Sequence, residues 1–314
     1  MRFNNVESNK PTAISLFSGC GGLDLGFIKA GFDIVFANDI DKEACESYAK
    51  NIGKHILCKD IYGLDTKEIP NADILIGGFP CLGFTIANGK NRNVDSRYNS
   101  LYLEYARVLK DKQPKYFLVE NVAGIQSGKG FKENFYEKIL PTFQSCGYEL
   151  KHTLLNASDF GVPQNRKRVI IIGKRLDIKT EISFPKALKA KPKTLKDAIS
   201  DLPLEYDENI PNHTGSKHKI TINGYVGNRK LEWDKPAPTI TGRGSRGGGA
   251  VIHPHPNLHR RLSVRECARI QSFPDSFIFY GSNGATYAQI GNAVPPLMSY
   301  YIAKEFITAL KNKI

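Results

Sequence analysis

Short apolar segments alternate with amphipathic segments over about the first 175 residues, which predicts strands that alternate with helices. The apolar segments contain few polar residues, as is typical of strands buried on both faces of a sheet. The expected strands cover residues 13–17, 34–37, 74–77, 116–119 and 169–172. This order of elements favours an α/β fold built on a parallel sheet.

The predicted helices lie between these strands and near the C-terminus. Apolar residues at helical spacing predict helices over 41–51, 101–112 and 135–143. Ser263 and Glu266 have the spacing of a capping box, which predicts a short helix that begins there. Pro296 suits the first turn of a final helix.

The pattern breaks down between about residues 176 and 262, where prolines, lysines and glycines replace regular periodicity. We interpret this stretch as the main part of a second domain. The predicted division places residues 1–176 plus 283–314 in the first domain and residues 177–282 in the second.

The composition is that of a globular protein, except for its charge. The 314 residues carry a formal net charge of +13, which favours an anionic partner such as nucleic acid. The alternative is that the positive charge serves only solubility.

Six cysteines stand too far apart for a Cys-x-x-Cys motif, so we expect reduced thiols and no metal. The N-terminal segment is polar and does not resemble a signal peptide. No stretch approaches the roughly 18 apolar residues that a membrane span needs. We therefore expect a cytoplasmic, nucleoid-associated protein without a membrane partner.

A glycine turn follows the first strand, in the sequence from Phe17 to Asp24. Such a turn lets the backbone approach a nucleotide-like ligand closely, although a plain tight turn is the alternative. Asp39 follows the second strand, where α/β nucleotide folds bind ribose hydroxyls, and Asp60 offers a further carboxylate. Acidic groups at these positions fit a ligand with an uncharged ribose.

Pro80 and Cys81 come after the third apolar strand and the pair Gly77-Gly78. A thiol at this place is a candidate nucleophile, and the alternative is a small buried cysteine in the core. Glu120 ends the next buried strand, so it is expected at the same crevice, where a carboxylic acid can hold a ring nitrogen. The alternative for Glu120 is an ion-paired cap.

Arg166 and Arg168 lie on one side of an extended segment. They are candidates to bind a phosphate or a base oxygen, and an exposed basic strand edge is the alternative.

Six motifs in the same order resemble the DNA (cytosine-5)-methyltransferases of bacterial restriction-modification systems. They are Phe17 to Gly22, Phe79-Pro80-Cys81, Glu120-Asn121-Val122, Gln164 to Arg168, Arg265 to Pro274 and Gln289 to Pro296. The resemblance implies an S-adenosylmethionine-dependent, Rossmann-like mixed sheet with a small, irregular target-recognition domain. It assigns the first predicted domain to catalysis and the second to target recognition.

The resemblance implies methyl transfer to carbon 5 of a flipped cytosine, with S-adenosylhomocysteine as the product. Cys81 would add to carbon 6, while Glu120 would bind N3 and the exocyclic amine. Arg168 would contact O2, and Arg166 would hold the loop or a phosphate. The implied cofactor-binding residues are Phe17, Ser18, Gly19, Cys20, Gly21, Gly22, Leu23, Asp39, Ile40, Asp60, Ile61, Pro80, Leu101, Asn292, Ala293 and Val294.

Two segments are expected to contact DNA. Residues 82–97 follow the nucleophile and are predicted to close over DNA, with Thr85 and Arg97 as contacts. Residues 239–249 are the predicted base-reading loop, with Arg243 and Arg246, and a solvated turn is the alternative. Leu82 departs from the family, which has Gln there.

Three histidines, His253, His255 and His259, lie close together in the sequence, and we expect them at the surface or on phosphates. The predicted partner is double-stranded DNA, the predicted state is a monomer, and a companion restriction endonuclease is expected. A transfer-RNA cytosine methyltransferase is the alternative, because Phe84-Thr85 resembles that group. Its Cys-Phe-Thr triplet is missing, since no cysteine lies between Cys146 and Cys267.

Overall fold

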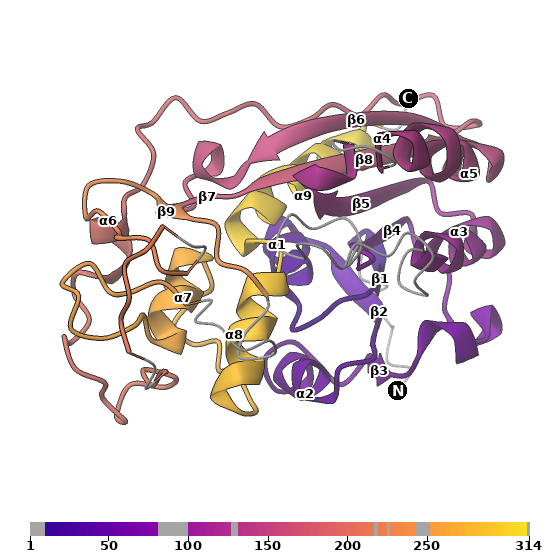
Figure 1. The fold of residues 1–314 in the computed structure, drawn as a ribbon. Helices are drawn as coiled ribbons and strands as arrows, with labels where there is room; N and C mark the ends of the chain where they lie inside the picture. Colours follow the sequence, from indigo (N-terminus) through magenta and orange to yellow (C-terminus); the bar gives the residue numbers. More distant parts are fainter. Residues whose placement is uncertain are drawn as a thin grey trace, which may run out of the picture.

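The structure, a computed structural model, describes residues 10–80, 100–126, 131–216, 219–224, 227–242 and 252–312. Its centre is a seven-stranded sheet with the strand order β3-β2-β1-β4-β5-β8-β6 (Figure 1). The strands are β1 Thr12–Leu16, β2 Asp33–Asp39, β3 Ile56–Cys58, β4 Ile74–Gly77, β5 Tyr116–Val122, β6 Tyr148–Asn156 and β8 Lys167–Arg175.

The sheet is mixed. Strands β3, β2, β1, β4 and β5 run parallel to one another. Strand β8 runs antiparallel to both β5 and β6. All five predicted strands are present, and the implied mixed α/β sheet is confirmed.

The sequence patterns did not predict the two edge strands, β3 and β6. Strand β3 has only three residues, none of which is buried. Strand β6 carries Lys151 and His152 and has a largely half-exposed burial pattern. Edge strands pack against less of the core, so neither has the continuous apolar stretch that marks the central strands.

Helices cover both faces of the sheet. The helical segments of the main body are α1 Gly22–Ala30, α2 Lys42–Asn51, α3 Leu101–Lys112, α4 Phe131–Glu133, a π-helical turn Asn134–Ile139, α5 Leu140–Ser145 and α9 Pro296–Lys311. One core cluster joins α3 and α5 to the sheet, with Tyr105, Phe117 and Phe143 at its centre. The predicted helices over 41–51 and 101–112 are confirmed, and the third forms as the π-helical turn followed by α5.

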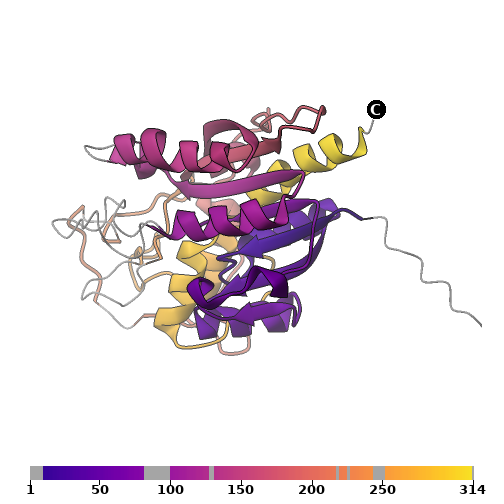
Figure 2. The ribbon, with the colours of Figure 1, turned by 90° about the vertical axis from the view of Figure 1, so that its right-hand side faces the viewer.

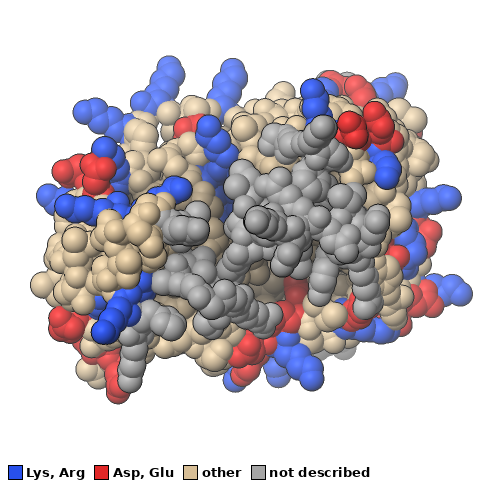
Figure 3. All heavy atoms as spheres, viewed as in Figure 1, with Lys and Arg blue, Asp and Glu red and all other residues tan. Residues whose placement is uncertain are grey.

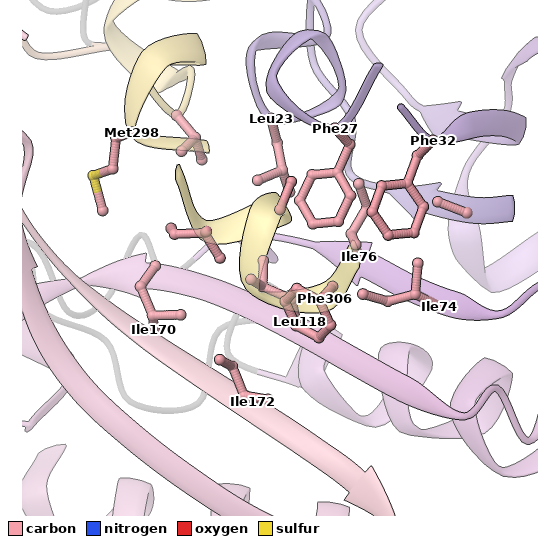
Figure 4. Close-up of a cluster of buried hydrophobic side chains, with 14 of the residues drawn as sticks. Leu23, Phe27, Phe32, Ile74, Ile76, Leu118, Ile170, Ile172, Met298 and Phe306 are labelled. Carbon is pink, nitrogen blue, oxygen red and sulfur yellow. The ribbon is translucent and has the colours of Figure 1, made fainter. Parts of the chain in front are cut away.

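A second core cluster lies between the sheet and the helices α1 and α9 (Figure 4). Phe27 of α1 contacts Phe306 of α9, with ring centroids 6.0 Å apart. Gly26 allows this close approach, because a Cβ there would lie 2.4 Å from the Ser299 side chain. Helix α9 leads to the C-terminus marked in Figure 2, where the Thr180 hydroxyl donates to the carbonyl of Asn312.

A third core cluster joins the irregular segment to the helices that follow it. Helix α6 Leu195–Ile199 lies within the irregular segment, and α7 Val264–Ile270 and α8 Asn283–Asn292 follow it. The capping box at Ser263 and Glu266 is present, and α9 begins with the predicted Pro296. Tyr287 and Ile290 of α8 belong to this third cluster. The division into a domain of residues 1–176 plus 283–314 and a domain of residues 177–282 stays a prediction.

Buried arginines make polar contacts that join the segments around the third core cluster. Arg260 forms a two-pronged ion pair with Glu266, with both N–O distances at 2.7 Å. Arg261 donates to the carbonyl of Ile252, and Arg265 donates to the carbonyl of Phe277. These arginines satisfy backbone carbonyls that no regular sheet or helix would satisfy. No helix within the described ranges is long and apolar enough to cross a membrane.

Candidate active site

Four neighbouring parallel strands deliver the predicted site residues to one edge of the sheet. Strands β1, β2, β4 and β5 all end at this edge, which is where ligands bind in open α/β sheets. The glycine turn follows β1, Asp39 ends β2, Pro80 follows β4 and Glu120 lies near the end of β5. The described residues of the predicted crevice therefore lie at this one edge of the sheet, each at the end of the strand that the sequence predicts.

The glycine turn between β1 and α1 has an unusual backbone. Phe17 has φ of 55°, Gly19 has φ of 55° and Gly21 has φ of 91°. Left-handed conformations are strained for a non-glycine residue such as Phe17, and strained residues cluster at functional sites. Ser18 fixes the turn, because its backbone N–H donates to the carbonyl of Asn38 at 3.0 Å.

Asp39 links the turn to the end of β2. The Gly19 N–H donates to Asp39 Oδ2 at 2.7 Å, and the Asp41 N–H donates to Asp39 Oδ1 at 2.9 Å. Burial raises the pKa of Asp39. Ile40, the next residue, is 65% exposed and offers an apolar surface beside the carboxylate. A carboxylate beside an open apolar side chain suits a ribose and the base attached to it.

Hydrogen bonds also join the segment that follows β3 to α3 and to the residue before it. Arg107 of α3 donates to the carbonyl of Ile61 at 3.0 Å, and the hydroxyl groups of Tyr62 and Ser100 lie 2.9 Å apart. Asp60 caps the short helical turn that follows it, since its side chain accepts from the Tyr62 N–H. The structure thus brings Asp60 and Ile61 close to the start of α3, where Leu101 lies.

The predicted cofactor residues at the end of α8 lie against the glycine turn. A Cβ on Gly22 would lie 2.5 Å from the Val294 carbonyl oxygen and 2.9 Å from the Ala293 Cβ. Only glycine permits this approach. Residues far apart in sequence therefore form one cradle with a carboxylate and an apolar side chain, which fits a nucleoside such as that of S-adenosylmethionine.

A buried carboxylate, Asp24, supports the cradle from behind. Ser15 and Tyr48 donate to its two oxygens, each at 2.7 Å, and the Tyr48 hydroxyl lies 3.0 Å from His55 Nε2. Burial raises the pKa of Asp24 to about 6. Asp24 stands where a dinucleotide fingerprint has its third glycine, and its contacts give it a structural role in the turn.

Glu120 and Arg168 form an ion pair at the edge of the crevice. Arg168 Nε lies 2.8 Å from Glu120 Oε1, and both side chains are about nine-tenths buried. The pairing of β5 with β8 holds them in adjacent strands. Gly78 makes room for the carboxylate, because a Cβ there would lie 3.1 Å from Glu120 Oε2. Glu120 is therefore placed beside the segment that leads to Cys81.

Asn121 is a site residue that our sequence-based residue assignments did not include. Its Nδ2 donates to the carbonyl of Phe79 at 3.1 Å, and its Oδ1 accepts from the Val122 N–H. The Phe79 ring packs against Tyr102 and Tyr105. These contacts fix the chain two residues before Cys81. The Glu120-Asn121-Val122 motif was the available signal, but it drew attention to the carboxylate alone.

Arg166, which the resemblance predicted to hold the loop or a phosphate, makes its described contacts to the chain itself. Its side chain is buried, and its Nη atoms donate to the carbonyls of Ile240, Gly291 and Ala293 at 2.8 to 3.0 Å. These contacts favour a role in joining segments of the chain over contact with a phosphate. A catalytic role for Arg166 stays untested.

Several predicted residues lie outside the described ranges. They are Cys81, Leu82, Thr85, Arg97, Arg243 and Arg246. The closing loop over residues 82–97 and most of the base-reading loop over 239–249 stay predictions for the same reason. On the face shown in Figure 3, described Lys and Arg side chains stand in several groups with Asp and Glu side chains between them.

The expectation for two of the three histidines was wrong. His253 and His255 are each 2% exposed, and burial lowers the pKa of each to about 4. Both are therefore neutral at neutral pH and unsuited to binding a surface phosphate. His259 is partly exposed, and its Nε2 lies 2.6 Å from the carbonyl oxygen of Leu204. The sequence spacing did not show that their segment folds inward.

Comparisons with known proteins agree with this geometry. A family model described as C-5 cytosine-specific DNA methylase matches residues 12–308. The chain is 41% identical over 321 residues to the Type II methyltransferase M.MthTI of Methanothermobacter thermautotrophicus, across 93% of this chain and 95% of that one. It is 39% identical over 336 residues to M.FnuDI of Fusobacterium nucleatum, across 96% of this chain and 95% of that one.

Solved structures show the same fold. A prophage-encoded DNA modification methyltransferase from E. coli superposes with a TM-score of 0.79 at 26% identity, over 96% of this chain and all of that one. The S. pombe Dnmt2 methyltransferase has a TM-score of 0.70 at 24% identity, over 96% of this chain and 99% of that one.

The mixed seven-stranded sheet and the cradle at its edge define a methyltransferase of the S-adenosylmethionine-dependent class. The chain belongs to the C-5 cytosine-specific DNA methylase family. It is a DNA (cytosine-5)-methyltransferase, and its relatives M.MthTI and M.FnuDI are Type II methyltransferases.

Proposed function

We propose that this enzyme methylates one cytosine in a short specific duplex sequence through a covalent Cys81 adduct. The observation that carries this proposal is the Glu120–Arg168 ion pair, held 2.8 Å apart beside Gly78. A carboxylate and a guanidinium beside Gly78, in the segment that leads to Pro80, support their proposed roles as the acid and the base-oxygen donor. The duplex buries the ring atoms of cytosine, so the base is flipped out before it reacts.

Cys81 supplies the nucleophile. Carbon 5 of cytosine is a weak nucleophile until a group adds at carbon 6, and the Cys81 thiolate forms that bond. The reference pKa of a thiol is about 8.5, so the thiolate needs stabilisation by positive charge or deprotonation as it attacks. After transfer, removal of the carbon 5 proton lets the Cys81–carbon 6 bond break and restores the aromatic ring.

Glu120 and Arg168 hold the base. Glu120 binds N3 and the exocyclic amine, which draws electrons from the ring as the Cys81 bond forms. Arg168 orients the Glu120 carboxylate through Nε, and in the proposed complex another guanidinium N–H contacts O2. Asn121 fixes the Phe79 carbonyl, which orients the segment that leads to Cys81 relative to Glu120.

S-adenosylmethionine, when bound, supplies an electrophilic methyl group. Support for its place comes from the cradle of Gly22, Ala293 and Val294 and from the carboxylate of Asp39. Asp39 suits the ribose hydroxyls and Ile40 suits the adenine face, while Asp60, Ile61 and the start of α3 close the pocket. We include the other cofactor residues predicted from the sequence in the same site.

The direct test measures which nucleic acid is modified. Purified protein is incubated with methyl-labelled S-adenosylmethionine and either plasmid DNA or transfer RNA, and bisulfite sequencing then locates the methylated cytosine. We expect label in duplex DNA at one short sequence. Label in transfer RNA alone would establish the alternative function. The DNA methyltransferases with 41% and 39% identity favour DNA.

We also propose that the protein acts as a monomer in the cytoplasm, on nucleoid DNA, beside a companion restriction endonuclease. The support for a companion is the naming of its relatives as Type II methyltransferases. Size-exclusion chromatography with light scattering tests the monomer. Restriction of unmethylated plasmid by extracts of the source cells tests the companion.

A further inference from the structure

The buried guanidinium of Arg166 donates hydrogen bonds to backbone carbonyls in two distant parts of the chain. It is 1% exposed, and no carboxylate pairs with it among the described residues. One Nη donates to Ile240 O at 2.9 Å, while the other donates to Gly291 O at 2.8 Å and Ala293 O at 3.0 Å. A buried guanidinium is costly, so this arrangement points to a purpose beyond filling space.

Gln164 and Gln271 extend the same link. The Ile240 N–H donates to Gln164 Oε1 at 3.0 Å, so Ile240 is held at both its N–H and its carbonyl. Gln164 Nε2 donates to Gln271 Oε1 at 2.7 Å. Gln271 Nε2 in turn donates to the carbonyl of Ile290 at 2.7 Å. The amide groups of Gln164 and Gln271 all have partners, and satisfied buried amides are rigid, whereas Arg166 Nε has no hydrogen-bond partner among the described residues.

The two linked segments also press directly on each other. A Cβ on Gly242 would lie 1.6 Å from Asn292 Oδ1, and a Cβ on Gly291 would lie 2.2 Å from the Thr241 carbonyl oxygen. The two segments therefore touch backbone to backbone at Gly291, and the Asn292 side chain lies directly on the backbone of Gly242. Because packed interiors deform little, a shift of one segment must displace the other.

Each segment leads toward a different ligand in the proposed function. Residues 239–242 lead into Arg243 and Arg246, which are predicted to read DNA bases. The segment from Gly291 runs on to Val294, whose carbonyl lies against Gly22 of the cofactor cradle. Arg166 lies between the two.

We propose that Arg166 is a positioning residue that couples recognition of the target sequence to the affinity for the cofactor. This inference rests on the proposed function of the two segments. Target DNA that fixes residues 239–242 also fixes Gly291 to Val294 through Arg166, so the cofactor binds more tightly. By thermodynamic linkage, the cofactor strengthens binding to the target sequence by the same factor.

The test measures the dissociation constant of S-adenosylhomocysteine by titration calorimetry. The protein is mixed with a short duplex that contains the sequence found by bisulfite sequencing, or with the same duplex scrambled. The ratio of the two constants is the coupling. We expect a coupling of about tenfold in the wild type and of about one in Arg166→Lys, because an ammonium cannot reach both segments at once.

Arg265→Lys is the matched control. Arg265 is also 1% exposed and donates to three carbonyls, those of Pro211, Pro274 and Phe277, yet it touches neither segment. It is expected to lower the melting temperature while keeping the coupling. Gln164→Met is the second variant if Arg166→Lys does not fold by circular dichroism, and it is expected to reduce the coupling.

Three results would overturn the inference: a wild type without coupling, a folded Arg166→Lys or Gln164→Met with unchanged coupling, or an equal loss in Arg265→Lys. A wild type that methylates no DNA refutes the proposed function instead, so the two failures are distinguishable.

Discussion

Arg168 Nε lies 2.8 Å from Glu120 Oε1, and the two side chains come from antiparallel neighbours, β8 and β5. Because the ion pair is buried, the Glu120 carboxyl group is held in place before a base arrives. Glu120→Gln keeps the shape of the side chain but removes its charge. We expect single-turnover methylation to slow by about 100-fold or more, while the affinity for S-adenosylhomocysteine stays unchanged.

The matched control is Glu149→Gln, which removes a half-exposed carboxylate that pairs with Lys174 on the far side of β8. It should methylate at the wild-type rate. Wild-type turnover by Glu120→Gln would show that the carboxylate does not act on the base.

Asn121 is expected to set the rate of the chemical step through the Phe79 carbonyl. Asn121→Ala removes the 3.1 Å hydrogen bond that fixes the chain before Pro80 and Cys81. A net loss near 1 kcal/mol corresponds to about a fivefold to tenfold fall in single-turnover rate. Calorimetry should show unchanged S-adenosylhomocysteine binding. A weaker affinity with an unchanged rate would assign Asn121 to the cofactor instead.

Asp24 should make the stability of the protein depend on pH. Its pKa is about 6 in the folded protein, against 3.8 for an ordinary aspartate. The folded state therefore holds the proton more tightly, so the stability that Asp24 contributes is full below about pH 3.8 and is lost as the pH rises through about 6. Asp24→Asn cannot lose a proton and avoids this change.

The measurement is the free energy of unfolding by urea at pH 4 and pH 7. We expect the wild type to lose about 2 kcal/mol more than Asp24→Asn over this range. Asp159→Asn, at an exposed position, controls for the loss of a negative charge. Parallel pH profiles for the wild type and Asp24→Asn would contradict the burial argument.

The central strands could be predicted because burial on both faces imposes an apolar sequence. Strand β4 reads Ile-Leu-Ile-Gly and is buried throughout, and its predicted bounds match the structure. Strand β6 could not be predicted, because a strand at the sheet edge tolerates residues such as Lys151 and His152. Local pattern therefore marks the middle of the sheet better than its margins.

The residues of the candidate site also differ in whether the sequence predicts them. The ends of strands gave Asp39 and Glu120 directly, since parallel strands end at one edge. The contact of Asn121 with Phe79 depends on how neighbouring strands meet, and the carbonyls bound by Arg166 lie about 70 and 125 residues away in sequence. No local pattern encodes such partners, which is why the sequence left Arg166 between holding the loop and binding a phosphate, and predicted the buried histidines at the surface or on phosphates.

The most direct test of the central claim is whether Cys81 bonds to cytosine. A duplex with 5-fluorocytosine at the target position is incubated with protein and S-adenosylmethionine, and the digested complex is mapped by mass spectrometry. Fluorine at carbon 5 cannot leave as a proton does, so the adduct is trapped. Cys58→Ala, at an exposed cysteine, serves as the control and should still form it.

We predict one covalent complex, with the modified base attached to Cys81, and none with Cys81→Ala. Methylation of the ordinary duplex without any adduct on the fluorinated one, or an adduct on a different cysteine, would contradict the account.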